Sequence, residues 1–300
     1  MNKTIMIRIG LAGWGDHPTL YKEPGAKKNK LAAYSRWFNS VEVDSTFYAV
    51  QSPELMKRGA DDTPPEFRFV VKAYQGMTGY SRGGGSSYKP FASEEAMYAA
   101  FHESLAPLRE AGKLAAVLFQ YPPWFDCSRP YVDQIRKAKR LMGDVPVALE
   151  FRHQSWFEPD MRERTLDFTR REGWMHTVCD EPQAGEGSVP IVEAATDEKV
   201  TIVRLHGRNK EGWVSTGQPN WREIRYLYRY NKDELEEWVE RLRRLDELSQ
   251  TVYILFNNNS GGDAADNALQ LMQMLDQLPV RGAFEQVKPV EEAEQLELFD

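Results

Sequence analysis

Short apolar segments rich in Val, Ile and Phe alternate along the chain with longer segments of helical periodicity. Parallel strands joined by crossover helices produce this pattern, because strands that are buried on both faces read as continuous apolar runs. We count eight such runs in 300 residues, which favours an eight-stranded α/β barrel. The predicted strands are Met6–Leu11, Val41–Ser45, Phe67–Ala73, Leu114–Gln120, Val145–Phe151, Trp174–Cys179, Val200–Leu205 and Thr251–Asn257.

Helices are expected in the segments between these runs. A doubly wound sheet and two smaller domains are the alternatives, but the chain has neither a GxGxxG turn nor a boundary rich in Pro and Gly. We therefore predict one TIM-barrel-like (β/α)8 domain over residues 1–284, followed by a short acidic, flexible tail over residues 285–300. The predicted helices are Lys30–Phe38, Glu94–Ala111, Pro130–Leu141, Asp160–Glu172, Asp233–Leu248 and Asp263–Leu278.

Polar residues recur on one face of the predicted strands, near their carboxyl ends. Alternate residues of a barrel strand face its interior, and barrel enzymes place their chemistry where the strands end. A mixed-charge pocket is therefore predicted at this end of the barrel, with the alternative that the charges pair as a structural plug. The inward polar residues are Glu42, Asp44, Lys72, Gln120, Glu150, Arg152, Arg204 and His206.

Composition restricts the class of protein. The chain is 41% hydrophobic and 28% charged, which allows a sizeable core. Its net charge of −7 argues against a grip on nucleic acid or membrane over the whole surface, although a local basic pocket is compatible with it. No segment approaches the ~20 apolar residues that span a bilayer, so we expect a cytoplasmic protein without a membrane partner. Cys127 and Cys179 lack the spacing of a metal site and are expected to be packing residues.

Seven ordered motifs resemble those of the YecE-like family, domain of unknown function 72. The resemblance implies a TIM-barrel-like fold and a bacterial or archaeal origin, and it supplies no reaction. Two departures are Asp44, where an asparagine is expected, and Met77-Thr78-Gly79, which lacks a histidine at its third position. The motifs are Gly10-Leu-Ala-Gly-Trp14, Val41-Glu-Val-Asp-Ser-Thr-Phe-Tyr48, Phe67-Arg-Phe-Val-Val-Lys72, Leu118-Phe-Gln-Tyr-Pro-Pro123, Glu150-Phe-Arg-His-Gln-Ser-Trp156, Val203-Arg-Leu-His-Gly207 and Phe256-Asn-Asn258.

The pocket residues indicate an anionic ligand and acid–base chemistry. Cationic side chains bind phosphate or carboxylate, and a carboxylate or imidazole moves a proton. The predicted catalytic residues are Glu150, His206 and Glu42, and the predicted ligand-binding residues are Lys72, Arg152, Arg204, Asp44, Gln120, Trp14 and Asn257. The glycine segment 83–85 is a candidate lid or a solvated loop.

Two function classes follow from this pocket. The first is an enzyme that acts on a phosphate- or carboxylate-bearing small molecule, or on a nucleic-acid end, by hydrolytic or lyase chemistry. The second is a ligand-binding module without catalysis, and the sequence leaves open which is right. No organic cofactor is indicated. A metal-dependent nuclease or isomerase-like barrel is a further alternative, in which Glu150, Asp180 and His206 are the ligands, in an arrangement similar to the sites of endonuclease IV and xylose isomerase-like barrels.

The C-terminal tail suggests a different partner. Residues 295–299, Gln-Leu-Glu-Leu-Phe, resemble the peptide by which bacterial proteins dock on the DNA sliding clamp. Gln295, Leu296, Leu298 and Phe299 are then the binding residues, presented after an acidic stretch. The alternative is that the two leucines and the phenylalanine fold back onto the barrel.

Overall fold

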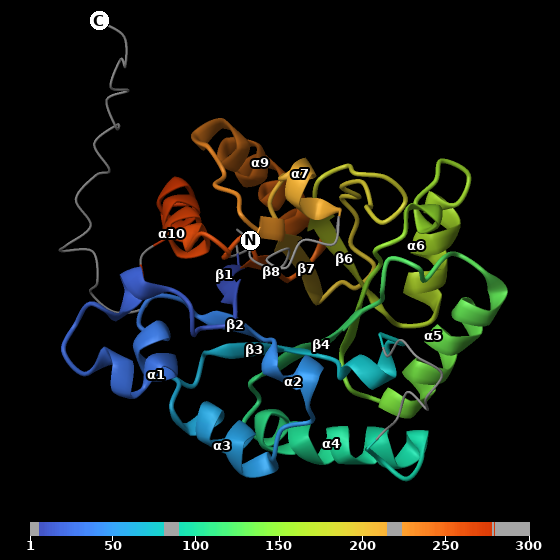
Figure 1. Ribbon diagram of the computed structural model, residues 1–300, viewed down its shortest axis with the longest axis horizontal. Coiled ribbons are helices and arrows are strands. Elements are labelled where there is room, and N and C mark those ends of the chain that lie inside the picture. The colour runs from blue at the N-terminus through green and yellow to red at the C-terminus, as the bar shows by residue number, and fades with distance from the viewer. Residues whose placement is uncertain (1–5, 81–89, 215–223, 278, 280–300) are drawn as a thin grey trace, which may run out of the picture.

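Eight parallel strands close into a barrel in the computed structural model, in the order in which they occur in the sequence (Figure 1). The structure describes residues 6–80, 90–214, 224–277 and 279. The predicted fold is confirmed, and each predicted strand coincides with an observed one to within two residues at either end. The strands are β1 (Ile7–Ala12), β2 (Ser40–Val43), β3 (Arg68–Lys72), β4 (Leu114–Gln120), β5 (Val147–Glu150), β6 (Met175–Asp180), β7 (Val200–Leu205) and β8 (Thr251–Phe256).

Helices surround the strands, as Figure 1 shows. All six predicted helices occur, most of them shorter than expected. The described α-helices are α1 (Lys30–Tyr34), α2 (Ser45–Tyr48), α3 (Pro53–Asp61), α4 (Glu94–Glu110), α5 (Arg129–Met142), α6 (Arg162–Arg171), α7 (Lys210–Trp213), α9 (Lys232–Leu248) and α10 (Asp263–Met274). The 3-10 helices are η1 (Pro18–Tyr21), η2 (Ala26–Lys28), η3 (Gln75–Met77) and η4 (Gln154–Trp156).

The helix α3 was not predicted, although its start carries two local signals. Ser52 accepts a hydrogen bond from the backbone N–H of Leu55 at 3.3 Å, and Pro53 occupies the first helical position. Serine at the cap and proline directly after it favour a helix start. Between β6 and β7, by contrast, residues 181–199 connect the strands without a helix.

The barrel has two apolar regions that the strands separate. Outward side chains pack against the helices and form the larger core. Inward side chains form a smaller core that fills the barrel below its carboxyl end. This inner core contains Val70, Ala115, Ala116, Leu118, Ala148, Met175, Ile202, Tyr253 and Leu255. Polar side chains at the carboxyl end of the barrel therefore pack against this inner apolar core.

Two predicted features lie outside the described residues: the glycine segment 83–85 and the clamp-like peptide 295–299. Both remain predictions. In the part of the chain that the structure describes, no helix is both long enough and apolar enough to cross a membrane.

Gly10 allows β1 and β2 to approach each other closely, and its replacement tests this packing. A Cβ atom on Gly10 would lie 2.3 Å from the backbone oxygen of Ser40, its partner in the β1–β2 register. We expect Gly10→Ala to lower the free energy of unfolding by about 1–3 kcal/mol, as overpacking does. Gly15→Ala is the matched control, because nothing lies within 4 Å of its Cβ position. Urea denaturation measures both, and equal midpoints would contradict the close approach.

Candidate functional site

The polar side chains predicted to face inward meet at the carboxyl end of the barrel. Register and alternation explain this, because Gln120 pairs with Glu150, and Cys179 pairs with Arg204. Glu42, Glu150, Arg152, Arg204 and His206 are all buried. Unpaired charges at such positions would be costly, so their partners decide what the site can do.

Arg204 is the centre of this charged cluster. Its Nε and Nη2 donate hydrogen bonds of 2.7 and 2.6 Å to the two carboxylate oxygens of Glu42. Its Nη1 donates a third, of 2.5 Å, to Glu150. The planar guanidinium group suits such two-pronged pairing, which fixes both carboxylates in position. Arg204 thus joins β2, β5 and β7 across the barrel interior.

Arg152 binds the second carboxylate oxygen of Glu150. Its Nε donates a 2.7 Å hydrogen bond to Glu150 Oε1, and its Nη1 lies 3.2 Å from Glu181 Oε2. Burial acts to raise the pKa of Glu150, but the charges of Arg204 and Arg152 outweigh it and hold that pKa well below its usual range. Glu150 therefore stays ionised and is a fixed negative charge, not a proton shuttle.

Two other carboxyl groups of the site have the opposite property. Burial raises the pKa of Glu42 to about 7, although the charge of Arg204 opposes the rise. Burial likewise raises the pKa of Glu181 to about 7 against the charge of Arg152. Glu181 also accepts a 2.6 Å hydrogen bond from the backbone N–H of Val189. Carboxyl groups with pKa values near neutrality are suited to act as general acids or bases.

Asp44 and Lys72 are the members of the site nearest to solvent. Their side chains are 35% and 14% exposed, and Lys72 Nζ lies 3.3 Å from Asp44 Oδ1. Burial favours a neutral Asp44, but the charges of Lys72 and Arg204 outweigh it and lower the pKa of Asp44. The negative charge of Asp44 in turn helps to raise the pKa of Glu42. Asp44 is thus the more exposed of two carboxyl groups that interact electrostatically.

His206 is positioned as a neutral ring. Asn257 Nδ2 lies 2.9 Å from His206 Nδ1, and His206 Nε2 lies 3.4 Å from Glu150 Oε1. Burial lowers the pKa of His206 well below its usual range, and Arg152 and Arg204 lower it further. Arg152 Nη2 and Arg204 Nη1 lie 3.2 and 3.4 Å from His206 Nε2, so guanidinium groups, which can only donate hydrogen bonds, also surround the ring.

Aromatic rings lie over the cations at the mouth. The guanidinium carbons of Arg152 and Arg225 lie 5.2 and 4.2 Å from the ring centre of Trp213. The ring of Tyr226 lies 6.1 Å from those of Trp213 and His206. Burial would raise the pKa of Tyr226, but Arg225 and Arg152 outweigh it and lower that pKa. The cation–π contacts further stabilise the charged groups.

One group of described residues has the composition of a metal site. Ligand atoms of Glu150, Cys179 and His206 lie within 4.8 Å of one another. Both oxygens of Glu150 already accept hydrogen bonds from arginines, at 2.7 and 2.5 Å. The two guanidinium groups would compete with a divalent ion, so this group fits a metal poorly.

Asp180, named in the metal-dependent alternative, does not join Glu150 and His206. Its oxygens accept hydrogen bonds from Arg208 Nε at 3.0 and 3.1 Å and from Trp238 Nε1 at 2.8 Å. Asp180 pairs in register with Leu205, which faces outward, so its side chain is directed at α9. Side chains alternate along β6, so Cys179 and Glu181 face inward and Asp180 does not. The same alternation in the sequence could have identified Glu181 as a residue of the site.

Trp14 also lies elsewhere. It contacts the outer core and lines a cavity that outward side chains of β2 and β3 share, Val43 and Phe69. Trp213 and Tyr226 take the aromatic positions at the mouth instead. They follow β7 by several residues in a segment without strand periodicity, so the pattern of the strands gave no sign of them.

Two bacterial proteins of the same named family match most of the chain. UPF0759 protein YunF from Bacillus subtilis (strain 168) is 55% identical over 272 residues, which cover 90% of this chain and 95% of YunF. UPF0759 protein YecE from Escherichia coli (strain K12) is 26% identical over 192 residues, 64% of this chain and 65% of YecE.

Solved structures of bacterial relatives have the same fold. A DUF72 family protein from Enterococcus faecalis superposes with a TM-score of 0.85 at 35% identity, covering 91% of this chain and 96% of the other. A DUF72 family protein from Thermotoga maritima gives a TM-score of 0.76 at 30% identity, with 91% and 100% covered. Residues 8–291 match the family described as "Protein of unknown function DUF72". The chain therefore belongs to the DUF72 family.

Proposed function

We propose that the charged cluster is the active site of an enzyme that acts on a phosphate- or carboxylate-bearing small molecule, or on a nucleic-acid end. The reaction class is hydrolytic or lyase, in which a proton is moved and no organic cofactor is needed. One observation carries the proposal: carboxyl groups of one buried cluster differ in their affinity for protons. The pKa of Glu42 is about 7, whereas Glu150 is held ionised. Such pairs mark acid–base sites.

In this proposal Lys72 binds the anionic group of the ligand. It is the cation of the cluster nearest to solvent, with a side chain 14% exposed, while those of Arg152 and Arg204 are at most 1% exposed. Burial opposes its charge, but Asp44 raises the pKa of Lys72, so the ammonium group stays protonated. Arg152 and Arg204 serve as scaffold, because their hydrogen bonds go to buried carboxylates and to His206.

Glu42 is the proposed proton donor and acceptor, with Asp44 as its link to the ligand. The electrostatic interaction between the two carboxyl groups and the greater exposure of Asp44 support this order. Glu150 and the neutral His206 shape the field around the reacting group. A pocket without catalysis is the alternative, because paired charges also serve structural roles.

Turnover distinguishes the two alternatives. We expect the purified protein to convert a member of a panel of phosphomonoesters, phosphodiesters and hydroxy or keto acids. Glu42→Gln should reduce kcat by about 100-fold or more, the typical contribution of a general acid or base. Glu66→Gln, at an exposed position remote from the cluster, is the control. Binding of a panel member without turnover in either protein would support the non-catalytic alternative.

Anion binding at Lys72 can be measured without a substrate. Phosphate or sulfate should raise the melting temperature at low ionic strength, and the effect should shrink as sodium chloride is added. Lys72→Met should abolish the rise. Lys137→Met is the matched control, since Lys137 pairs with Glu94 outside the barrel. An equal rise in Lys72→Met and wild type would show that the anion binds elsewhere.

Glu42 should make stability depend on pH in a definite direction. A carboxyl group whose pKa is raised from 4.5 to about 7 by folding binds more protons in the folded state between these values. Its contribution is therefore present below pH 4.5 and is lost as pH rises through 7, by at most about 1.4 kcal/mol per pH unit. The difference in unfolding free energy between wild type and Glu42→Gln should shift against wild type over this range.

The difference between the two proteins is the quantity to measure, because other groups act oppositely. Buried His176, whose pKa burial lowers to about 4, gains stability as pH rises to its ordinary value of 6.5. Because wild type and Glu42→Gln both contain His176, its contribution cancels in the difference between their unfolding free energies. Urea denaturation at pH 5, 6, 7 and 8 measures the difference, and a difference that is constant across the range would exclude a raised pKa at Glu42.

A further inference from the structure

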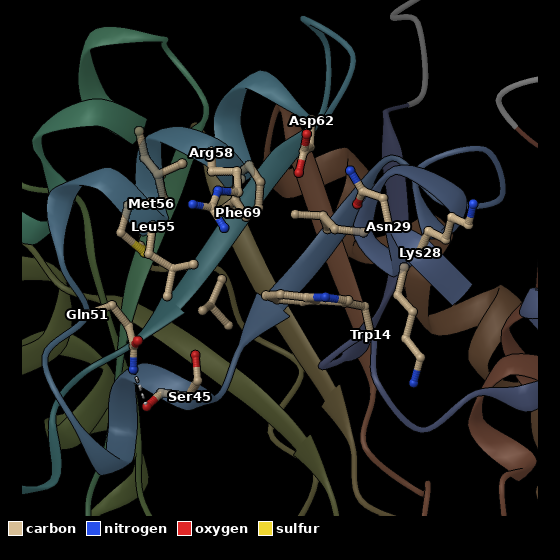
Figure 2. Close-up of a pocket in the computed structure, with 15 residues that line it drawn as sticks. Trp14, Lys28, Asn29, Ser45, Gln51, Leu55, Met56, Arg58, Asp62 and Phe69 are labelled. Carbon is tan, nitrogen blue, oxygen red and sulfur yellow. Dashed lines mark hydrogen bonds between the residues drawn. The ribbon is translucent and has the colours of Figure 1, made fainter. Parts of the chain in front are cut away.

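A cavity lies on the outside of the barrel, between α1 and α3. Its volume is about 310 Å3. Its strand residues, Val43 and Phe69, have the parity that faces the helices, whereas Glu42 faces the charged cluster. Figure 2 shows the residues that line it. The apolar lining comprises Trp14, Leu31, Val43, Leu55, Met56, Phe69 and Leu108.

The size and the walls of this cavity fit a small aromatic molecule. Close-packed interiors contain few voids larger than a water molecule, whereas small-molecule pockets begin at roughly 300 Å3. The indole of Trp14 extends into the cavity from the end of β1, opposite Leu55 and Met56 of α3 (Figure 2). Leu55 is 47% exposed. An aromatic ring would cover this apolar surface and stack against the indole.

The rim of the cavity favours a negative charge. Lys28, Lys30 and Arg58 line it together with a single acid, Asp62. Lys30 Nζ is engaged by the backbone oxygen of Gly15 at 2.7 Å. Arg58 makes no ion pair of 4 Å or less with any residue that the structure describes, and Figure 2 shows its guanidinium group beside the cavity. Arginine can bind both oxygens of a carboxylate.

We propose that this cavity binds a small organic anion with one or two aromatic rings. The ring lies against Trp14 between α1 and α3, and the carboxylate is bound by Arg58. This site is separate from the charged cluster and does not depend on the function proposed for it.

Two probes of equal shape separate the apolar and the charged parts of this site. Isothermal titration calorimetry on the full chain at pH 7.5 would compare 2-naphthoate with the uncharged 2-naphthamide. We expect naphthoate to bind about tenfold more tightly, as one charge-assisted contact allows. Arg58→Gln should weaken naphthoate about tenfold and leave naphthamide unchanged. Trp14→Leu should weaken both probes.

Three variants show whether the binding belongs to this cavity. Lys57→Gln is the matched control, because Lys57 neighbours Arg58 on α3 but pairs with Asp61 at 2.7 Å. Lys72→Met should also leave naphthoate binding unchanged, and a loss in that variant would assign the probe to the charged cluster. The tail is another candidate occupant: tighter naphthoate binding in a Leu298→Ala/Phe299→Ala variant would show that the tail competes for the cavity.

The proposal is overturned by any of four results: equal affinity for the two probes, no effect of Arg58→Gln, loss of binding in Lys72→Met, or competition by the tail. Retained melting temperatures in Arg58→Gln and Trp14→Leu would show that the variants are folded, so that their weaker binding reports on the site.

Discussion

The pairing of Arg204 with Glu42 and Glu150 governs the carboxyl end of this barrel. Its three hydrogen bonds, of 2.5 to 2.7 Å, cross the interior from β7 to β2 and β5, above a floor of apolar side chains. Water cannot replace a missing partner at such depth, so each charge requires the others. Removing one partner of a buried pair costs about 3–5 kcal/mol in other proteins. The cluster therefore fixes the strand ends from which the mouth residues project.

The same pairing divides the carboxyl groups into two kinds. Glu150 interacts with two guanidinium groups and stays ionised, whereas Glu42 shares Arg204 and lies beside Asp44, so that desolvation prevails and its pKa rises. Arg152 and Arg204 create the environment of the cluster. The proposed reaction depends on the raised proton affinity of the buried Glu42 and on the exposure of Asp44 and Lys72.

The sequence predicted the fold and most residues of the charged cluster, and there are physical reasons why it did not predict the rest. Apolar runs and strand alternation predicted the barrel and the convergence of Glu42, Glu150 and Arg204, because both follow from period-two geometry. The roles of the carboxyl groups did not follow, since a pKa depends on which partner each group meets in space. The sequence named Glu150, His206 and Glu42 together as catalytic candidates, and only their environments distinguish them: the pKa of Glu42 is raised, whereas those of Glu150 and His206 are lowered. Trp14 follows a strand directly, yet the loop after β1 turns it outward.

Neighbouring side chains of β2 point to opposite faces of the barrel wall, one toward the charged cluster and one toward the outer cavity. Glu42 points into the charged cluster, and its neighbour Val43 forms part of the outer cavity. A single backbone segment therefore separates a group that titrates near neutrality from a space large enough for a ligand. If filling the cavity displaces this strand, the proton affinity of Glu42 must change, and by thermodynamic reciprocity the occupancy of the cavity must then depend on pH to the same extent. A strand only four residues long would link the inside and the outside of the barrel.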